Sequence, residues 1–501
     1  MGCSACRTPD SNTITAKPPK PITSIPEKSQ VHTEPVQIKA YPASFGLNVN
    51  SKLSSHYALG VKIGEGPHGF VRIGTHKVSN IKRAIKTLEK SAARTEAEKS
   101  QFLNELEVLC QLDHPNLAQL HEYYEEDANY HLVTEYMPGG ELFDHIIHNK
   151  SCSESVIAGF MKQILGTLAF IHGKGLVHRN IKPENLLLDR NHPEAIVKLI
   201  DFGTSVFMAK QKQRRGGGAV LYAAPEVFEK SGYDEKCDVW SCGVVLYVML
   251  CGKPPFYGKT DQEVLSQVKT GKYSTSGPEW AVVSLSAIQL IDKMLEKKPK
   301  KRISAQDALK DPWLLKKTAA QLPAPEANTL SLQNLRNFRM ESKFQHIVTS
   351  FITANLLSKE EKTNLYLRFK ELDLNNDGKL SAEELRAAYL KVLDKEDAED
   401  EVRKVMESVD SNKSGFIDYS EFCTACSRKD RLINEENLLA AFRVFDIDQS
   451  GEITVAEVKE VLGVFGNDSH VIKLISQVDQ NGDGVIDLSE FKQMMLLCFS
   501  E

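Results

Sequence analysis

Four twelve-residue segments in the last third of the chain repeat one spacing of oxygen-bearing side chains, and no other feature restricts the fold as strongly. Each segment begins with Asp, ends with Glu and has Gly at its sixth position. Oxygen-bearing residues also stand at positions 3, 5 and 9, and apolar helical patterns flank the segments. The glycine allows a sharp turn that gathers these oxygens around one hard cation. The repeat therefore predicts four cation-binding loops, each between two helices.

These segments resemble the calcium loop of the EF-hand, in which position 7 adds a backbone carbonyl. The resemblance implies up to four Ca²⁺ ions bound by Asp373, Asn375, Asp377, Lys379, Ser381, Glu384, Asp410, Asn412, Ser414, Phe416, Asp418, Glu421, Asp446, Asp448, Ser450, Glu452, Thr454, Glu457, Asp479, Asn481, Asp483, Val485, Asp487 and Glu490. Apolar residues at position 8 predict a short strand bridge between paired loops: Leu380, Ile417, Ile453 and Ile486. We therefore expect an all-α, calmodulin-like domain of two EF-hand pairs over residues 359–501.

The formal charge changes sign along the chain. Residues 1–358 contain 44 Lys and Arg against 36 Asp and Glu, whereas residues 359–501 contain 18 against 31. A basic segment can bind nucleic acid, but the acidic groups here stand at metal-ligand spacing. We therefore expect a cation, and no nucleic acid, as the partner of these charges.

The stretch from residue 178 to residue 185 reads His-Arg-Asn-Ile-Lys-Pro-Glu-Asn and follows a helical pattern over residues 153–172. It resembles the catalytic loop of protein kinases, in which an Asp after the His-Arg pair accepts the proton of the substrate hydroxyl. That position is Asn180 here, and an amide does not take up a proton near neutral pH. The resemblance implies that Lys182 belongs to the catalytic group and that Asn185 holds a metal ion.

Other kinase motifs occur in the expected order over residues 57–313. We expect residues 57–71 and 78–88 to form two strands around a glycine-rich turn and residues 196–200 to form another strand, and the whole segment is similar to the α+β bilobal protein kinase fold. The resemblance implies an ATP and Mg²⁺ site built from Gly64, Gly66, Gly69, Lys86, Glu105, Glu135, Met137, Asn185 and Asp201.

Some residues depart from the kinase pattern. Pro67 removes an amide donor near the tip of the glycine-rich turn. Residues 205–222 contain no Asp or Glu, so Arg179 of the catalytic loop has no obvious acidic partner there. Ala219 stands where the family has a Thr that contacts the catalytic Asp. Glu226 and Arg302, by contrast, match the ion pair of the kinase large lobe.

Two segments connect or extend these domains. Residues 1–50 read as a disordered tether whose Gly2, Cys3 and Cys6 resemble an acylation signal, although the usual Ser or Thr is replaced by Cys6. One fatty chain binds membranes marginally, so a second would be needed for stable attachment. Residues 314–358 contain a basic amphipathic pattern, which indicates a connecting helix or an autoinhibitory and docking helix.

This order of tether, kinase-like domain, junction and four EF-hands resembles the calcium-dependent protein kinases of plants and protists. The resemblance implies Ca²⁺, ATP and Mg²⁺ as cofactors. Asn180 favours a calcium-sensing pseudokinase or severely impaired kinase, and the alternative is an active calcium-activated Ser/Thr kinase. We expect a monomer in the cytoplasm, associated with membranes through its N-terminus, with protein substrates or partners that the sequence does not identify.

Overall fold

The computed structural model describes residues 52–66, 69–90, 96–148, 152–208, 220–229, 232–318, 326–338, 343–427, 432–462 and 469–497. Residues Lys39–Glu501 belong to one compact unit. The expected tether with Gly2, Cys3 and Cys6 lies outside the described residues. So do Pro67 and Ala219.

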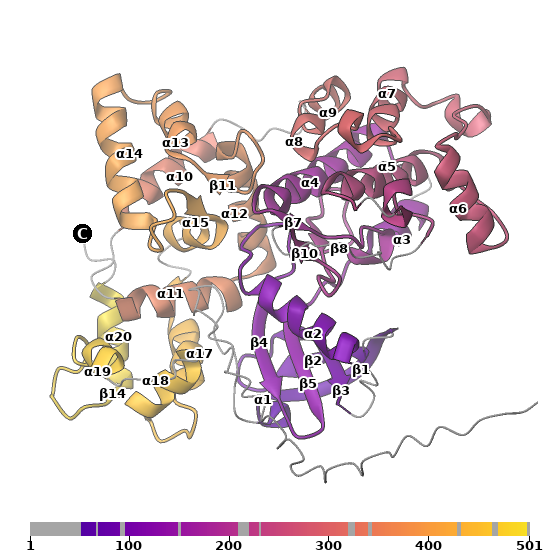
Figure 1. Ribbon diagram of the computed structural model, residues 1–501. Helices are drawn as coiled ribbons and strands as arrows, with labels where there is room; N and C mark the ends of the chain where they lie inside the picture. The colour runs from indigo at the N-terminus through magenta and orange to yellow at the C-terminus, as the bar shows by residue number, and fades with distance from the viewer. Residues whose placement is uncertain are drawn as a thin grey trace, which may run out of the picture. The chain divides into compact units, whose positions relative to one another are not determined.

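The small lobe is built on a five-stranded sheet in the order β1-β2-β3-β5-β4, antiparallel throughout. Its strands are β1 (Tyr57–Gly66), β2 (Gly69–His76), β3 (Lys82–Glu89), β4 (Leu120–Glu125) and β5 (Asn129–Glu135). The short α1 (Leu53–His56) precedes the sheet, and α2 (Glu96–Leu109) packs on it (Figure 1). At that contact the rings of Phe102 and Tyr130 lie 5.9 Å apart.

The two strands around the glycine-rich sequence are β1 and β2, so the first expected strand, residues 57–71, is divided between them. The chain turns within this segment and forms the β1–β2 hairpin, in which Gly66 pairs with Gly69. Gly69 has a φ of 106°, and a Cβ at this position would lie 1.9 Å from the Thr87 carbonyl oxygen. Both the backbone angle and the close approach of β3 require glycine.

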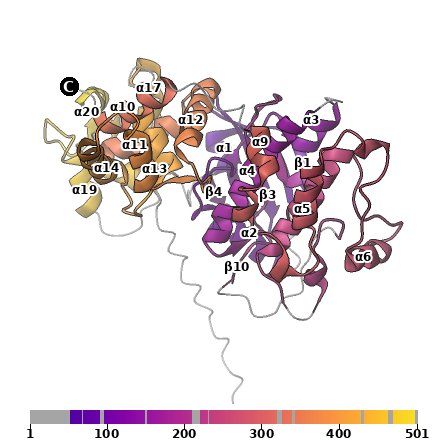
Figure 2. The ribbon, with the colours of Figure 1, turned by 90° about the horizontal axis from the view of Figure 1, so that it is seen from above.

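The large lobe is mainly helical. Its core helix is α4 (Glu154–Gly173), which Ser153 caps by accepting a hydrogen bond from the Val156 amide. The other helices are α3 (Leu142–His148), α5 (Lys236–Cys251), α6 (Asp261–Thr270), α7 (Leu285–Met294), α8 (Ala305–Ala308) and α9 (Pro312–Thr318). Figure 2 shows α4 among α5 and α9. Although α4 is long and apolar enough to cross a membrane, 72% of its apolar stretch is buried inside the protein, as expected for a core helix.

Short strands hold the loops of the candidate site. β6 (Gly140–Glu141), β8 (Leu186–Leu188) and β9 (Val197–Leu199) form a sheet in the order β6-β8-β9, and β7 (Leu176–Val177) pairs with β10 (Val206–Phe207). The strand expected at residues 196–200 is β9. The catalytic-loop stretch therefore runs between β7 and β8, and Asp201 lies two residues after the end of β9.

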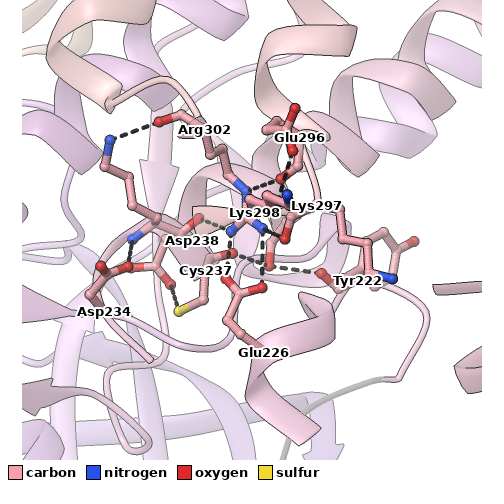
Figure 3. Close-up of polar contacts among 11 residues, drawn as sticks. Tyr222, Glu226, Asp234, Cys237, Asp238, Glu296, Lys297, Lys298 and Arg302 are labelled. Atoms are coloured by element: carbon pink, nitrogen blue, oxygen red, sulfur yellow. Dashed lines mark hydrogen bonds and ion pairs between the residues drawn. The ribbon is translucent and has the colours of Figure 1, made fainter. Parts of the chain in front are cut away.

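Glu226 and Arg302 form the expected ion pair in the large lobe (Figure 3). The guanidinium NH1 and NH2 donate to the two carboxylate oxygens of Glu226 at 2.5 and 3.0 Å. Arg302 also donates to the carbonyls of Lys236 and Glu296, and its guanidinium stacks 5.0 Å from the Trp240 ring. Both charged groups are buried, so the pair fixes the segment after residue 220 to the core of the lobe.

The C-terminal part is an all-α domain of two EF-hand pairs. The first pair contains α12 (Lys359–Leu372), α13 (Ala382–Tyr389), α14 (Lys395–Val409) and α15 (Tyr419–Cys426), and the second contains α17 (Glu435–Phe445), α18 (Val455–Leu462), α19 (Ser469–Ile475) and α20 (Leu488–Leu497). The predicted strand bridges are present. β11 (Lys379–Leu380) pairs with β12 (Ile417–Asp418), and β13 (Glu452–Ile453) pairs with β14 (Ile486–Asp487).

The junction forms two helices, α10 (Glu326–Asn337) and α11 (Lys343–Asn355). α10 contacts α12, α13, α14 and α15 of the first pair, and Tyr389 donates a hydrogen bond to the Leu332 carbonyl at 2.9 Å. α11 contacts α15 of the first pair and α17 and α19 of the second. Between α11 and α17 the Phe344 and Phe445 rings lie 5.5 Å apart. The junction thus forms two helices that contact both EF-hand pairs, and its docking and autoinhibitory role stays a prediction.

Candidate functional site

Lys86 on β3 and Glu105 on α2, two residues of the expected ATP and Mg²⁺ site, contact each other. Lys86 Nζ donates to Glu105 Oε2 at 2.5 Å and lies 3.7 Å from Asp201 Oδ1. Burial alone would lower the pKa of Lys86, but the two carboxylates outweigh it and raise the pKa above its ordinary value. The ammonium group is therefore charged and positioned to bind phosphate oxygens.

The hinge lies at the end of β5. The Glu135 amide donates to the Gln119 carbonyl at 3.0 Å, and the Glu135 carboxylate pairs with Lys198 at 2.8 Å. Met137 is buried. Glu135 and Met137 remain the residues whose backbone groups the kinase resemblance implies for the adenine contact.

A buried carboxylate holds the backbone of the catalytic loop. The two oxygens of Asp238, on α5, each accept a hydrogen bond at 2.8 Å, one from the His178 amide and one from the Arg179 amide. His172 also contacts this carboxylate at 2.9 Å. Burial would raise the pKa of Asp238, but these hydrogen bonds lower it below its ordinary value. The loop is thus anchored to a charged group at the centre of the large lobe.

Asn180 is tied into the site by three hydrogen bonds. Its backbone N–H donates to His178 Nδ1 at 3.2 Å, and its backbone carbonyl accepts from Asn185 Nδ2 at 2.7 Å. Its side-chain Nδ2 donates to Asp201 Oδ2 at 2.7 Å. Lys182 is half-buried and precedes the short 3₁₀ turn of Pro183–Asn185. The residue at the base position therefore presents a hydrogen-bond donor to the carboxylate of Asp201.

Asp201 and Phe202 have the arrangement of an assembled kinase site. Asp201 adopts a φ of 67°, which is rare for a residue with a side chain, and such strain is common at functional sites. Phe202 is fully buried, with its ring 4.7 Å from that of His178. These contacts hold the Asp201 carboxylate between the Lys86 and Asn180 side chains.

Asn104 is a residue that the sequence reasoning missed. From α2, its Nδ2 lies within 3.0 to 3.4 Å of three carbonyls, those of Phe202, Gly203 and Ser205. It therefore connects the helix that carries Glu105 to the segment that carries Asp201. Its place beside Glu105 in the sequence was the available signal, although a polar residue on a helix is usually solvated.

The donor set fits Mg²⁺. The side-chain Nδ2 of Asn185 donates to Asn180. The side-chain Oδ1 of Asn185 and the Asp201 carboxylate are therefore the groups that can face a cation. Hard oxygen donors of this kind, together with phosphate oxygens and water, are the ligands that Mg²⁺ prefers. When bound, the ion would neutralise charge on the phosphates.

Arg179 has partners that the sequence did not reveal. Its Nε donates to the Thr204 carbonyl at 2.5 Å and its NH1 to the Tyr233 hydroxyl at 3.0 Å. The expectation concerned an acidic partner in residues 205–222, and the described residues of that segment supply none; the Thr204 carbonyl just before the segment accepts from Arg179 instead. Both partners are neutral, since one is a backbone carbonyl and the other a hydroxyl.

The four calcium loops share one hydrogen-bond framework. In each, the Gly at position 6 donates its amide to the Asp at position 1 at 2.9 to 3.0 Å. The Glu at position 12 accepts amides from positions 2 and 9, as Glu384 does from Leu374 and Ser381. The Gly residues have φ between 77° and 90°. The loops are thus folded with their carboxylates gathered inward.

Like charges crowd these loops. The ligand oxygens of Asp446, Asp448 and Glu457 lie within 4.8 Å of one another. In the first loop, burial raises the pKa of Asp373 well above its ordinary value, and the carboxylates of Asp377 and Glu384 raise it further. Carboxylates at this spacing repel unless a cation lies between them, which is the arrangement of a Ca²⁺ site.

The first EF-hand pair contacts the kinase-like part directly. The Asp113 carboxylate accepts the Ser420 amide of this pair at 3.1 Å, and Arg83 donates to Asn355 of the junction helix α11 at 2.5 Å. Gly378 approaches His114 so closely that a Cβ on the glycine would lie 1.9 Å from the imidazole. Because residues 113–114 follow α2, the first calcium loop lies beside the segment that leads from Glu105 to the sheet.

Comparisons with known proteins agree with this architecture. The protein kinase domain family matches residues 57–314, and the EF-hand domain pair matches residues 362–427 and 435–496. The chain is 37% identical over 480 residues to calcium-dependent protein kinase 4 of Plasmodium falciparum. The aligned residues cover 92% of this chain and 90% of the Plasmodium protein. The chain is 33% identical over 491 residues to calcium-dependent protein kinase 9 of Arabidopsis thaliana, with 94% and 90% covered. The kinase domain implies ATP and Mg²⁺, and the EF-hands imply Ca²⁺ binding. The chain belongs to the calcium-dependent protein kinase family.

Proposed function

We propose that this protein is a calcium-sensing member of its family that binds nucleotide and transfers phosphate poorly. The observation that carries the proposal is the Asn180 side chain, which donates to Asp201 where the family has a proton acceptor. An amide oxygen is too weak a base to take the hydroxyl proton. The intact pair of Lys86 and Glu105 supports the nucleotide half of the proposal. Such a protein would act through calcium-dependent contacts with partner proteins.

The alternative is an active calcium-activated Ser/Thr kinase. The assembled Lys86, Glu105 and Asp201 arrangement favours it, because phosphoryl transfer depends mostly on positioning and charge neutralisation. A general base contributes about 10²- to 10⁴-fold, so its loss need not abolish turnover.

A phosphotransfer assay separates the two functions. The full-length protein and N180D are compared for calcium-stimulated transfer of labelled phosphate to a basic peptide. We expect N180D to be about 10²-fold faster or more, because it restores the base. D201A, made in both backgrounds, measures contaminating kinase activity. A wild-type rate that N180D leaves unchanged and D201A abolishes would establish the active kinase instead.

We also propose that the N-terminus attaches the protein to membranes. The support is the sequence Met1 to Cys6, with Gly2 as the myristoylation position and Cys3 and Cys6 as palmitoylation positions. G2A should move the protein from the membrane fraction to the soluble fraction of cells. Because one chain anchors weakly, C3S combined with C6S should do so as well. Unchanged membrane association of both variants would contradict the proposal.

A further inference from the structure

Both carboxylate oxygens of Asp201 have a nitrogen donor of the protein close to them. Asn180 Nδ2 donates to Oδ2 at 2.7 Å, and Lys86 Nζ lies 3.7 Å from Oδ1. If the amide of Asn180 were turned over, its oxygen would face the carboxylate and repel it, so the donating orientation is the favourable one. The carboxylate that would contact the metal ion is therefore already partly neutralised by the chain.

An Asp at position 180 would change this balance. It would place a second carboxylate within hydrogen-bond distance of Asp201, and two such groups repel each other unless a proton or cation lies between them. Asn180 removes that negative charge and supplies an N–H in its place. The triphosphate of ATP therefore approaches a site with one negative charge fewer, beside the charged Lys86.

We infer that Asn180 lets this site hold ATP nearly as well without Mg²⁺ as with it. The inference rests on the nucleotide binding proposed above. The neutralisation that Mg²⁺ gives to Asp201 and the phosphates is supplied in part by Asn180 and Lys86. A cation that binds Oδ2 of Asp201 shares that oxygen with the amide N–H of Asn180. Mg²⁺ therefore adds less to ATP affinity here than at a site with Asp at this position.

The test measures the affinity of the full-length protein for ATP by competition with a fluorescent ATP analogue. One arm contains excess Mg²⁺ and the other contains EDTA, and EGTA in both arms keeps Ca²⁺ away from the loops. We expect the wild-type affinity to differ by about threefold or less between the arms. N180D should lose about tenfold or more when Mg²⁺ is removed, since a hydrogen bond to a charged group is replaced by repulsion.

A second variant separates the hydrogen bond from the added charge. N180A removes the donor without adding a carboxylate, and we expect its Mg²⁺ dependence to lie between those of the wild type and N180D. Thermal unfolding of each variant shows that the fold is retained. If N180A behaves as the wild type does, the amide has no part in the effect and the inference is overturned.

The outcomes distinguish this inference from the function on which it rests. Tight ATP binding by the wild type with Mg²⁺, lost on its removal, overturns the inference and leaves nucleotide binding intact. Undetectable ATP binding in both arms overturns the proposed nucleotide binding itself.

Discussion

Lys362, on α12, shows how a half-buried charge responds to its surroundings. Its Nζ donates to the Ala354 carbonyl at 2.6 Å. Burial lowers the pKa of Lys362 to about 8, and the positive charges of Arg83 and Lys198 act in the same direction, while Glu135 opposes them. In the unfolded chain the same group titrates near 10.5. Keeping it charged in the folded protein therefore costs stability below pH 8, and this cost disappears as the pH rises toward 10.5.

We predict that K362M stabilises the protein at pH 7 by on the order of 1–2 kcal/mol, a figure reduced for the partial exposure of the side chain. The gain should shrink between pH 8 and pH 10.5. Denaturant unfolding at pH 7 and pH 10 measures it. The exposed Lys359 on the same helix supplies the control, K359M, which should change little. An equal gain at both pH values would indicate packing rather than ionisation.

At the scale of elements, the Glu226–Arg302 pair connects the segment after residue 220 to the loop before α8. We predict that R302M destabilises the large lobe by about 3–5 kcal/mol, because it leaves the Glu226 carboxylate buried without its partner. Denaturant unfolding followed by tryptophan fluorescence reports the loss, since Trp240 lies against the guanidinium.

The exposed pair of Arg403 and Asp400 is the matched control for this prediction. Its side chains are 62% and 46% exposed, so R403M should cost at most about 1 kcal/mol. Similar losses of unfolding free energy in R302M and R403M would show that burial does not determine the contribution of the Glu226–Arg302 pair.

Sequence patterns predicted the elements well where one period or motif dominates. The apolar spacing over residues 153–172 predicted α4, and the position-8 residues predicted both strand bridges, because side-chain chemistry alone specifies these features. The glycine-rich turn was expected, but the bounds of the strands around it were not, because they depend on the pairing of β1, β2 and β3, which joins residues distant in the sequence. The partners of Arg179 and the role of Asn104 were missed for the same reason.

The sequence predicted which residues form the candidate site, but it did not predict the hydrogen bonds between their side chains. Motif order gave Lys86, Glu105, Asn180 and Asp201, and the structure brings them together. That the Asn180 amide donates to Asp201 depends on side-chain orientation, which no spacing encodes.

At the scale of the whole molecule, the first calcium loop lies against α4 of the large lobe. A Cβ on Gly166 would lie 2.9 Å from the backbone oxygen of Asn376. We predict that G166A loosens this contact without weakening α4, because Ala is a better helix former than Gly. Amide hydrogen exchange at residues 113–117 should become faster, since Asp113 and His114 are covered by the same EF-hand pair.

Gly173 provides the control for this prediction, because a Cβ there would meet no atom within 4 Å. G173A should leave exchange at residues 113–117 unchanged. Equal protection in G166A and the wild type would show that the protein accommodates the methyl group without moving the EF-hand pair.

The hydrogen bonds of Asn180 also bear on its chemical ageing. Hydrolysis of an asparagine amide yields aspartate and ammonium, and at this position the product would be the family's catalytic residue. The usual route requires the next backbone nitrogen to attack the side-chain carbonyl, which needs a flexible chain. Here Ile181 is branched and 1% exposed. The backbone carbonyl of Asn180 is hydrogen-bonded to Asn185, and its side-chain Nδ2 is hydrogen-bonded to Asp201. We expect this loop to resist deamidation, so that stored protein keeps its asparagine.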